Sequence, residues 1–256
     1  MNADTLLAAF QLPAGALVNQ RVPKKLLLEQ AKLTPALKSQ IQTGIEELTW
    51  IAALKPTTIG VPEYRDQTRE YLEIAVLRLD LRPEAQYDPL AKQIHRGIPY
   101  PVVLICSRPA SVTLSLAHRR SSQAEAGATV LDGSMLSVSL AVGEPAGLPV
   151  ELQQAFLDSL RLSQQAQTNM YTLYQGWYER LEALLAGMIS GQYALAATLT
   201  QAENRRVALA NHARLLREIQ QLHAQAQRET QLNRRVQINL TIQRLQAELA
   251  TATTNL

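Results

Sequence analysis

Apolar and polar positions follow two different patterns along this chain of 256 residues. Up to about residue 148, short helical segments alternate with runs that repeat every two residues, and a period of two is typical of strands. The segment 71–81, YLEIAVLRLDL, and the apolar run VVLIC at 102–106 predict buried strands. SVTLSLAHR and MLSVSLAV predict two more strands, and Asp88-Pro89 predicts a helix between the first two. This order predicts a small α/β head domain.

Further helix and strand signals occur before residue 70. Asp4 predicts the cap of a first helix, and Pro23 predicts the start of a second over KKLLLEQAK. Thr34 followed by Pro35 predicts a third helix, because a hydroxyl caps free N–H groups and proline fits the first helical turn. The segments EELTWIAAL and TTIGV predict strands.

A Gly- and Pro-rich segment, GEPAGLPV at 143–150, separates this part from a remainder without proline. We therefore predict an α+β fold, with a head domain over 1–148 and a long antiparallel helical hairpin, a coiled coil, over 149–256. In the first arm of this hairpin, apolar residues recur in steps of four and three, as in a coiled-coil seam. The seam consists of Met170, Tyr174, Trp177, Leu181, Leu184 and Met188.

The second arm is predicted as one helix from about Thr198 to Leu249, roughly 75 Å long at 1.5 Å per residue. It contains two apolar seams that are displaced by two residues, and so by roughly 200° around the helix. The helix is therefore expected to change its partner, or to pack on two sides, near residues 229–238. The first seam consists of Leu215, Ile219, Leu222 and Ala226, and the second of Ile238, Ile242, Leu245 and Leu249.

A polar interruption separates the two seams in the stretch ETQLNRRVQINL. Its polar residues include Asn233, Arg234, Arg235 and Asn239. Asparagine at a seam position commonly fixes the register of a coiled coil, so one interpretation is purely structural. The other interpretation is a contact site for a partner protein or a nucleic acid, and the sequence leaves both open.

The net charge of +3 is small, but its distribution is uneven. All six lysines precede residue 93, whereas the second arm is rich in arginine, which fits phosphate geometry well. These arginines are candidates for contacts with DNA or RNA phosphates, and the competing interpretation is a solvated helix surface. No Phe, Tyr or Trp follows Tyr193, which excludes base stacking on such residues along this arm. The candidate arginines are Arg205, Arg206, Arg214, Arg217, Arg228, Arg234 and Arg235.

Few residues suggest catalysis. Cys106, the only cysteine, lies in an apolar run and is predicted to be a buried small residue. The chain has no Gly-rich phosphate loop, and its four histidines lack the spacing of metal ligands. Asp66, Glu70, Glu73 and Asp80 suggest a metal-dependent nuclease, but no lysine on the strand between them completes the usual set. We expect no cofactor, no metal and no enzymatic activity.

Four motifs resemble those of a bacterial domain-of-unknown-function family, the one numbered four-three-nine-one. They are VNQRVPKKLLLEQ, IEELTWIAALKPTTIGV, EIAVLRLDL with IPYPVVLI, and ETQLNRRVQINLTIQRLQAEL, and they span nearly the whole chain in order. The resemblance implies an association with helicases and DNA methyltransferases in restriction-like or anti-phage defence gene clusters. It implies no catalytic residues, and it makes Asn233, Arg234, Arg235, Val236 and Asn239 members of the family's last motif.

The expected function is therefore that of an accessory subunit in an antiviral defence system. It would dock onto a helicase or DNA methyltransferase of the same gene cluster through its coiled coil, and it is a candidate homo-oligomer. The alternative is a protein that binds DNA or RNA directly through the arginine-rich arm. Neither a secretory signal nor a run of about 18 apolar residues occurs, so we expect a soluble, cytoplasmic protein.

Overall fold

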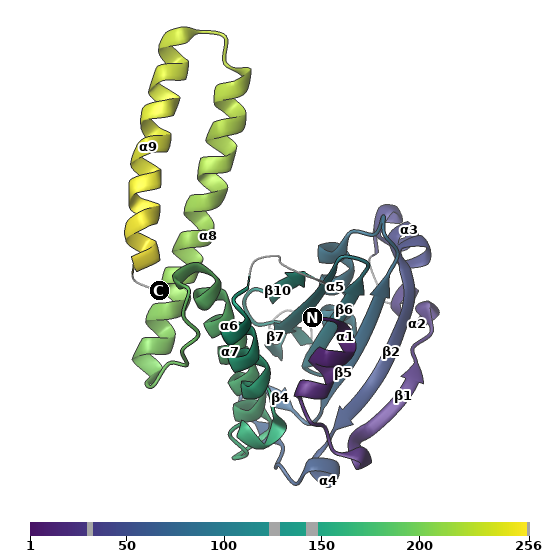
Figure 1. Ribbon diagram of the computed structural model, residues 1–256. Coiled ribbons are helices and arrows are strands. Elements are labelled where there is room, and N and C mark those ends of the chain that lie inside the picture. The colour runs from purple at the N-terminus through teal and green to yellow at the C-terminus, as the bar shows by residue number, and fades with distance from the viewer. Residues whose placement is uncertain (30–32, 123–128, 142–147, 255–256) are drawn as a thin grey trace. The chain divides into compact units, whose positions relative to one another are not determined.

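The computed structural model describes residues 1–29, 33–122, 129–141 and 148–254 of the chain (Figure 1). The fold is α+β, with a mixed sheet followed by helices. The chain forms two compact units, Met1–Leu181 and Glu182–Leu256, which we call the sheet unit and the helix-pair unit. The division lies within α7 (Met170–Ser190), whereas the sequence predicted a boundary near residue 148. No helix among the described residues has the length and apolarity needed to cross a bilayer.

Six strands form the main sheet in the order β1-β2-β5-β6-β7-β10. Neighbouring strands are antiparallel except for β5 and β6, which are parallel and are connected through the helix α5 (Tyr87–Gly97). A crossover of this kind is required because parallel strands cannot be joined by a tight turn. The strands are β1 (Leu17–Arg21), β2 (Ile45–Leu54), β5 (Ile74–Leu81), β6 (Val102–Arg108), β7 (Ser111–Ala117) and β10 (Leu136–Ala141).

The strands predicted from alternation are confirmed as β2, β5, β6, β7 and β10. The pairing of β6 with β7 through a short connection is that of a hairpin. The sequence did not predict β1 or the two small sheets. These pair β3 (Tyr64–Arg65) with β4 (Glu70–Tyr71), and β8 (Arg119–Ser121) with β9 (Thr129–Leu131).

Local capping explains two differences between the predicted and the observed elements before residue 70. The cap of the first helix is Asn2, whose side chain accepts a hydrogen bond from the Thr5 N–H at 2.8 Å, and not Asp4. TTIGV is not a strand, because Pro56 starts a helical turn and Gly60, with φ of 71°, ends it in the left-handed region that favours glycine. The helices of this part are α1 (Ala3–Ala9), α2 (Lys24–Leu28), α3 (Pro35–Gly44) and α4 (Pro56–Ile59), with a 3₁₀ turn at Ala14–Ala16.

The two faces of the sheet bury different sets of helices. One face packs against α2, α3 and α5, and its core includes Leu77, Leu79 and Leu104, all fully buried. The other face carries α1, which contacts both β6 and α6 (Val150–Ser159). A 3₁₀ turn at Leu162–Gln164 follows α6, and its Leu162 N–H donates to the Phe10 carbonyl at 2.9 Å. The sheet is therefore covered on both faces.

The first part of the seam in α7, from Met170 to Leu181, is buried in the sheet unit. The Tyr174 hydroxyl donates to the Val102 carbonyl at 2.8 Å and accepts from the Ala117 N–H at 2.9 Å, and both partners lie on strands. The Trp177 indole packs edge-on against Phe10 and donates to the Leu160 carbonyl at 2.8 Å. Met170, Tyr174, Trp177, Leu181 and Leu184 are fully buried, whereas Met188 is 45% exposed. The seam thus anchors α7 onto the sheet unit.

The predicted single rod is wrong, because the second arm folds back on itself. It forms α8 (Leu199–Arg228) and α9 (Leu232–Thr254), which are joined by Glu229–Gln231 and run in opposite directions (Figure 1). At 1.5 Å per residue, the longer helix is about 45 Å long. We call these two helices the helix pair.

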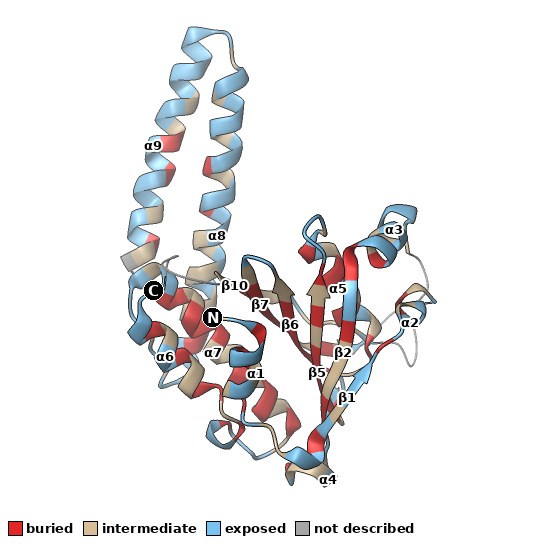
Figure 2. Ribbon diagram, turned by 45° about the vertical axis from the view of Figure 1, so that its right-hand side comes forward, coloured by how far each residue is buried: buried red, intermediate tan, exposed pale blue. Residues whose placement is uncertain are grey.

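The two apolar seams of the second arm face each other in this pair. Leu215 and Ile219 of α8 form one buried cluster with Ile242 and Leu245 of α9. Figure 2 shows these buried positions in red on the facing sides of α8 and α9. The two seams are out of phase because they lie on two separate helices. Each helix has its own apolar side, and the turn between them brings the two sides face to face.

Candidate docking surface on the helix pair

An apolar stripe runs along the outer side of α9. Leu232, Val236 and Leu240 are 64%, 47% and 54% exposed. Their spacing of four residues places them within about 80° of one another on a helix that turns about 100° per residue. Ile242 and Leu245, which face α8, lie on a different side and are buried. We call Leu232, Val236 and Leu240 the outer stripe.

Polar members of the same motif flank the outer stripe. Asn233 lies on one side of it, and Arg235 and Asn239 lie on the other, by the same helical geometry. All three are exposed, as is Arg234. The residues predicted as a polar interruption are therefore the border of an apolar surface, and no described residue pairs across helices with Asn233 to fix a register.

The turn between α8 and α9 lies directly beside this surface. Glu229 ends α8 with an extended ψ of 121°, and its Oε1 accepts from the Gln231 N–H at 2.8 Å. The Gln231 carbonyl then accepts the first α9 hydrogen bond, from the Arg235 N–H at 3.0 Å. Next to the turn is an open hollow of about 510 Å³, lined by Gln225, Glu229, Asn233, Arg234, Gln237 and Ile238.

The candidate arginines of the helix pair other than Arg205 divide into two groups. Those distant from the turn interact within the chain: Arg206 pairs with Glu182 at 2.9 Å, and Arg214 pairs with Glu218 at 3.0 Å. Arg217 donates to the Ala213 carbonyl at 3.2 Å. Near the turn, Arg228, Arg234 and Arg235 are exposed and form no ion pair with a carboxylate of the described residues. Unpaired positive charge is therefore concentrated at the turn end of the helix pair.

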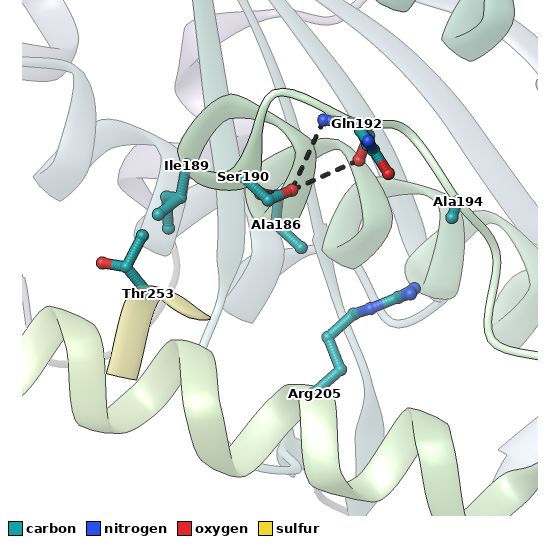
Figure 3. Close-up of a pocket in the computed structure, with 7 residues that line it drawn as sticks. All are labelled: Ala186, Ile189, Ser190, Gln192, Ala194, Arg205 and Thr253. Carbon is teal, nitrogen blue, oxygen red and sulfur yellow. Dashed lines mark hydrogen bonds between the residues drawn. The ribbon is translucent and has the colours of Figure 1, made fainter. Parts of the chain in front are cut away.

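Arg205 lies apart from the turn, at a second hollow of the helix-pair unit. Figure 3 shows it opposite Ser190 and Gln192, in a hollow of about 450 Å³ that Ile189 and Thr253 also line. The Ser190 hydroxyl donates to the Ala186 carbonyl at 3.0 Å, which uses its proton within the helix. Among the described residues, Arg205 is the only charged side chain that lines this hollow. It is not among the residues that line the hollow at the turn, so it is not part of the charged group there.

The four carboxylates considered for a nuclease do not converge. Glu73 pairs with Lys55 at 3.3 Å, and Glu70 pairs with Arg65 at 3.2 Å. Asp80 pairs with Arg78 at 3.0 Å, and burial raises the pKa of its carboxyl group. Seven residues of extended chain, roughly 23 Å, separate Glu73 from Asp80. Among the described residues, no three His, Cys, Asp or Glu side chains are grouped to hold a metal ion.

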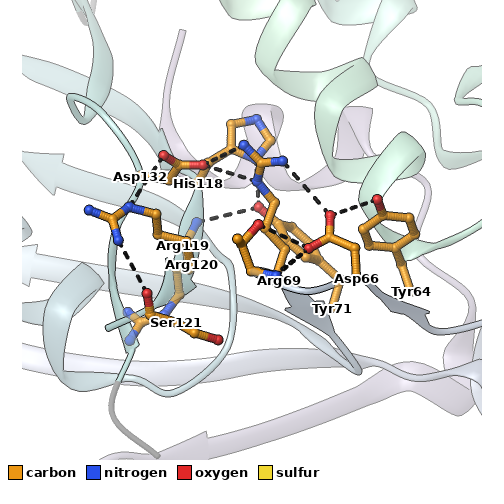
Figure 4. Close-up of polar contacts among 10 residues, drawn as sticks. Tyr64, Asp66, Arg69, Tyr71, His118, Arg119, Arg120, Ser121 and Asp132 are labelled. Atoms are coloured by element: carbon orange, nitrogen blue, oxygen red, sulfur yellow. Dashed lines mark hydrogen bonds and ion pairs between the residues drawn. The ribbon is translucent and has the colours of Figure 1, made fainter. Parts of the chain in front are cut away.

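Asp66, the fourth carboxylate, belongs to a structural polar cluster (Figure 4). Hydrogen bonds from the Thr68 N–H and the Tyr64 hydroxyl hold its pKa at about 2. Nearby, Arg69 donates to Asp132 at 3.0 and 2.7 Å, which ties the segment of β3 and β4 to the segment of β8 and β9. No local pattern in the sequence predicts this cluster, because Arg69 and Asp132 lie 63 residues apart.

Comparisons with known proteins give one match. The model of the family described as Domain of unknown function (DUF4391) matches residues 10–249 of the chain. The match covers the sheet unit after α1 and nearly all of the helix pair. No curated protein and no solved structure matches.

Proposed function

We propose, on the premise that this chain belongs to the family DUF4391, that it is a non-catalytic accessory subunit. Its helix pair acts as an antiparallel coiled-coil hairpin that docks onto a helicase or DNA methyltransferase of the same gene cluster, within an antiviral defence system. The observation that supports docking is the outer stripe of α9, three large apolar side chains left exposed beside the turn.

The outer stripe has the composition of an interface centre. Burying a leucine or valine side chain stabilises a complex by about 1.5–3 kcal/mol, before the costs of association are subtracted. Arg235 borders the stripe as an exposed charge, and rim charges of this kind mainly speed association and select complementary partners. The partner surface is expected to be an apolar groove bordered by carboxylates.

The test is a binding measurement against the products of the neighbouring genes. A variant in which Leu232, Val236 and Leu240 are all changed to Gln is expected to lose at least about tenfold in affinity, which corresponds to 1.4 kcal/mol. Val207→Gln is the matched control, because Val207 is 70% exposed on α8 and lies outside the stripe. If wild type binds a neighbour's product and the triple variant binds it equally well, docking through α9 is wrong.

The second candidate function is direct binding of DNA or RNA by the helix-pair unit. The observation that favours it is charge: residues 182–256 contain eight arginines and five glutamates, which equals the whole net charge of the chain. Arg228, Arg234 and Arg235 are exposed candidates that no described carboxylate neutralises.

Salt dependence distinguishes the two functions. Binding through phosphates weakens with a log-log slope of about −0.9 for each phosphate neutralised on duplex DNA, whereas apolar docking changes little. The double change Arg234→Ala and Arg235→Ala is expected to reduce that slope if these residues contact phosphates. A slope near zero for the wild type excludes the nucleic-acid function.

A further inference from the structure

One face of β7 and β10 is rich in hydroxyl side chains. Thr113 and Ser115 point to the face that carries α5, and both are fully buried. They alternate with Val112, Leu114 and Leu116, which are buried on the opposite face. The Thr113 hydroxyl lies 2.8 Å from the hydroxyl of Ser139 on β10. The Ser115 hydroxyl lies 2.9 Å from Nε2 of the buried His95, so it already has a partner in the core. The hydroxyl pair of Thr113 and Ser139 is the part of this face that requires an explanation.

Arg108, the last residue of β6, lies on the same face of the sheet. Its guanidinium packs over the ring of Tyr87 at 5.7 Å and donates to the Thr113 hydroxyl at 3.4 Å. An arginine side chain offers five N–H donors. The buried Nε of Arg108 has no hydrogen-bond partner, and no carboxylate of the described residues forms an ion pair with this arginine. Among the described residues, no carboxylate therefore neutralises its positive charge, and its buried Nε–H lacks an acceptor.

A hollow of about 570 Å³ opens in front of this arginine. Its wall consists of Arg108, Ser139 and the first residues of α5, from Gln86 to Pro89. It lies at the carboxyl end of β6, beside the parallel pair of β5 and β6. In parallel α/β sheets, ligands usually bind in crevices at the carboxyl ends of the strands, and β5 and β6 form the one parallel pair among the described strands of this sheet. The volume is in the range of sites that bind small molecules.

We propose that this hollow binds a phosphate monoester group. Arg fits phosphate through two parallel N–H···O bonds, and the exposed Ser139 hydroxyl, which lines the hollow, supplies a further donor to a remaining oxygen. The buried Thr113 hydroxyl, 2.8 Å from that of Ser139, holds Ser139 in place. A carboxylate, with two oxygens, would be satisfied by the guanidinium alone. Asp88 also lines the hollow and is exposed, so its negative charge limits the site to one anionic group.

Binding is tested with the full chain by calorimetric titration, using inorganic phosphate and a nucleoside monophosphate as separate probes. Saturable binding of either probe in the millimolar range or tighter is expected. Binding of both identifies a site for the phosphate group itself, and binding of the nucleotide alone identifies a site that also holds the nucleoside. No binding of either probe by the folded wild-type protein overturns the proposal.

Variants locate the site. Arg108→Gln is expected to lower the affinity at least about tenfold, and Ser139→Ala, an exposed position on β10, is expected to lower it severalfold. Arg82→Gln is the matched control, because Arg82 is an exposed arginine whose side chain donates to the Thr43 carbonyl and does not line the hollow. If Arg108→Gln does not fold, Ser139→Ala decides. Unchanged affinity in a folded Arg108→Gln or in Ser139→Ala overturns the placement of the site.

Discussion

The sheet unit and the helix pair use apolar side chains in opposite ways. In the sheet unit, strands such as β5 and β6 are covered by helices on both faces, and Leu77 and Leu104 are fully buried. In the helix pair, one narrow cluster around Leu215 and Leu245 is buried, while Leu232 and Leu240 remain more than half exposed. The comparison shows that the sheet unit buries a large two-sided core, whereas the helix pair buries one narrow cluster and leaves the outer stripe exposed, which is the surface that the proposed docking uses.

The largest expected effect is the loss of stability of the sheet unit in Trp177→Ala. Trp177 is fully buried, packs on Phe10 and donates to the Leu160 carbonyl, so its removal leaves a large cavity. A loss of about 3–5 kcal/mol is expected. Urea unfolding followed by the fluorescence of Trp50 measures it. An unchanged midpoint would contradict the burial of α7 on the sheet unit.

A smaller effect is expected in the core of the helix pair. Ile242→Ala removes a side chain that is 3% exposed in the cluster between α8 and α9, and a loss of about 2 kcal/mol is expected. Both tryptophans, Trp50 and Trp177, belong to the sheet unit, so fluorescence reports that unit and circular dichroism at the helical band reports both. In the variant, part of the helical signal is expected to be lost at lower urea than in wild type, whereas the midpoint of the fluorescence change is expected to stay the same. A shift of both signals together would mean that the two units unfold as one.

The next effect is a pH dependence confined to the sheet unit. Burial, with a contribution from Arg119, lowers the pKa of His95 to about 3, so the folded chain holds this ring neutral. The unfolded chain binds the proton below its pKa of about 6.5, and stability therefore falls as the pH drops from 6.5 towards 3. The expected slope is about 1.4 kcal/mol for each pH unit. His95→Gln, which retains a polar group for Ser115, is expected to remove this part of the slope in urea unfolding at several pH values. An identical slope in the variant would contradict the burial of a neutral His95.

The smallest effect on stability is expected where the effect on binding is largest. Changing Leu232, Val236 and Leu240 to Gln alters only exposed positions, so unfolding is expected to shift by less than about 0.5 kcal/mol. Thermal unfolding followed at the helical band measures this. A substantial loss of stability would mean that the outer stripe is part of a packed core, and would weaken its assignment to a partner.

Elements with a strong local pattern, either a period or a continuous apolar run, could be predicted from the sequence. Elements that depend on contacts between distant segments could not. β5 and β6 are recognisable because nearly every position is apolar and buried. β8 and β9 have three residues each, and their pairing depends on contacts such as the Asp132 N–H donating to the His118 carbonyl at 2.8 Å. Short strands of this kind have no period to detect.

The turn at Glu229–Gln231 was missed for a different reason. It contains neither glycine nor proline, the two residues that most strongly mark turns. The phase shift between the seams was visible, but a helix packed on two sides explained it equally well. The exposure of the outer stripe was invisible too, because Val236 and Leu240 lie where a continued first seam would have passed. The apolar seam correctly indicated that Met170 and Tyr174 are buried. The surface against which they pack was not predicted, because Tyr174 contacts the strands of the sheet unit and not a second helical arm.

The short connection between α8 and α9 has an evolutionary consequence. Because the buried cluster repeats along both helices, an insertion of seven residues in each would lengthen the pair by about 10 Å and keep the facing sides in phase. Such insertions leave every contact of the sheet unit unchanged. Relatives of this chain can therefore vary the reach of the outer stripe independently of the fold that supports it, and matched length changes in α8 and α9 among family members would record that adjustment.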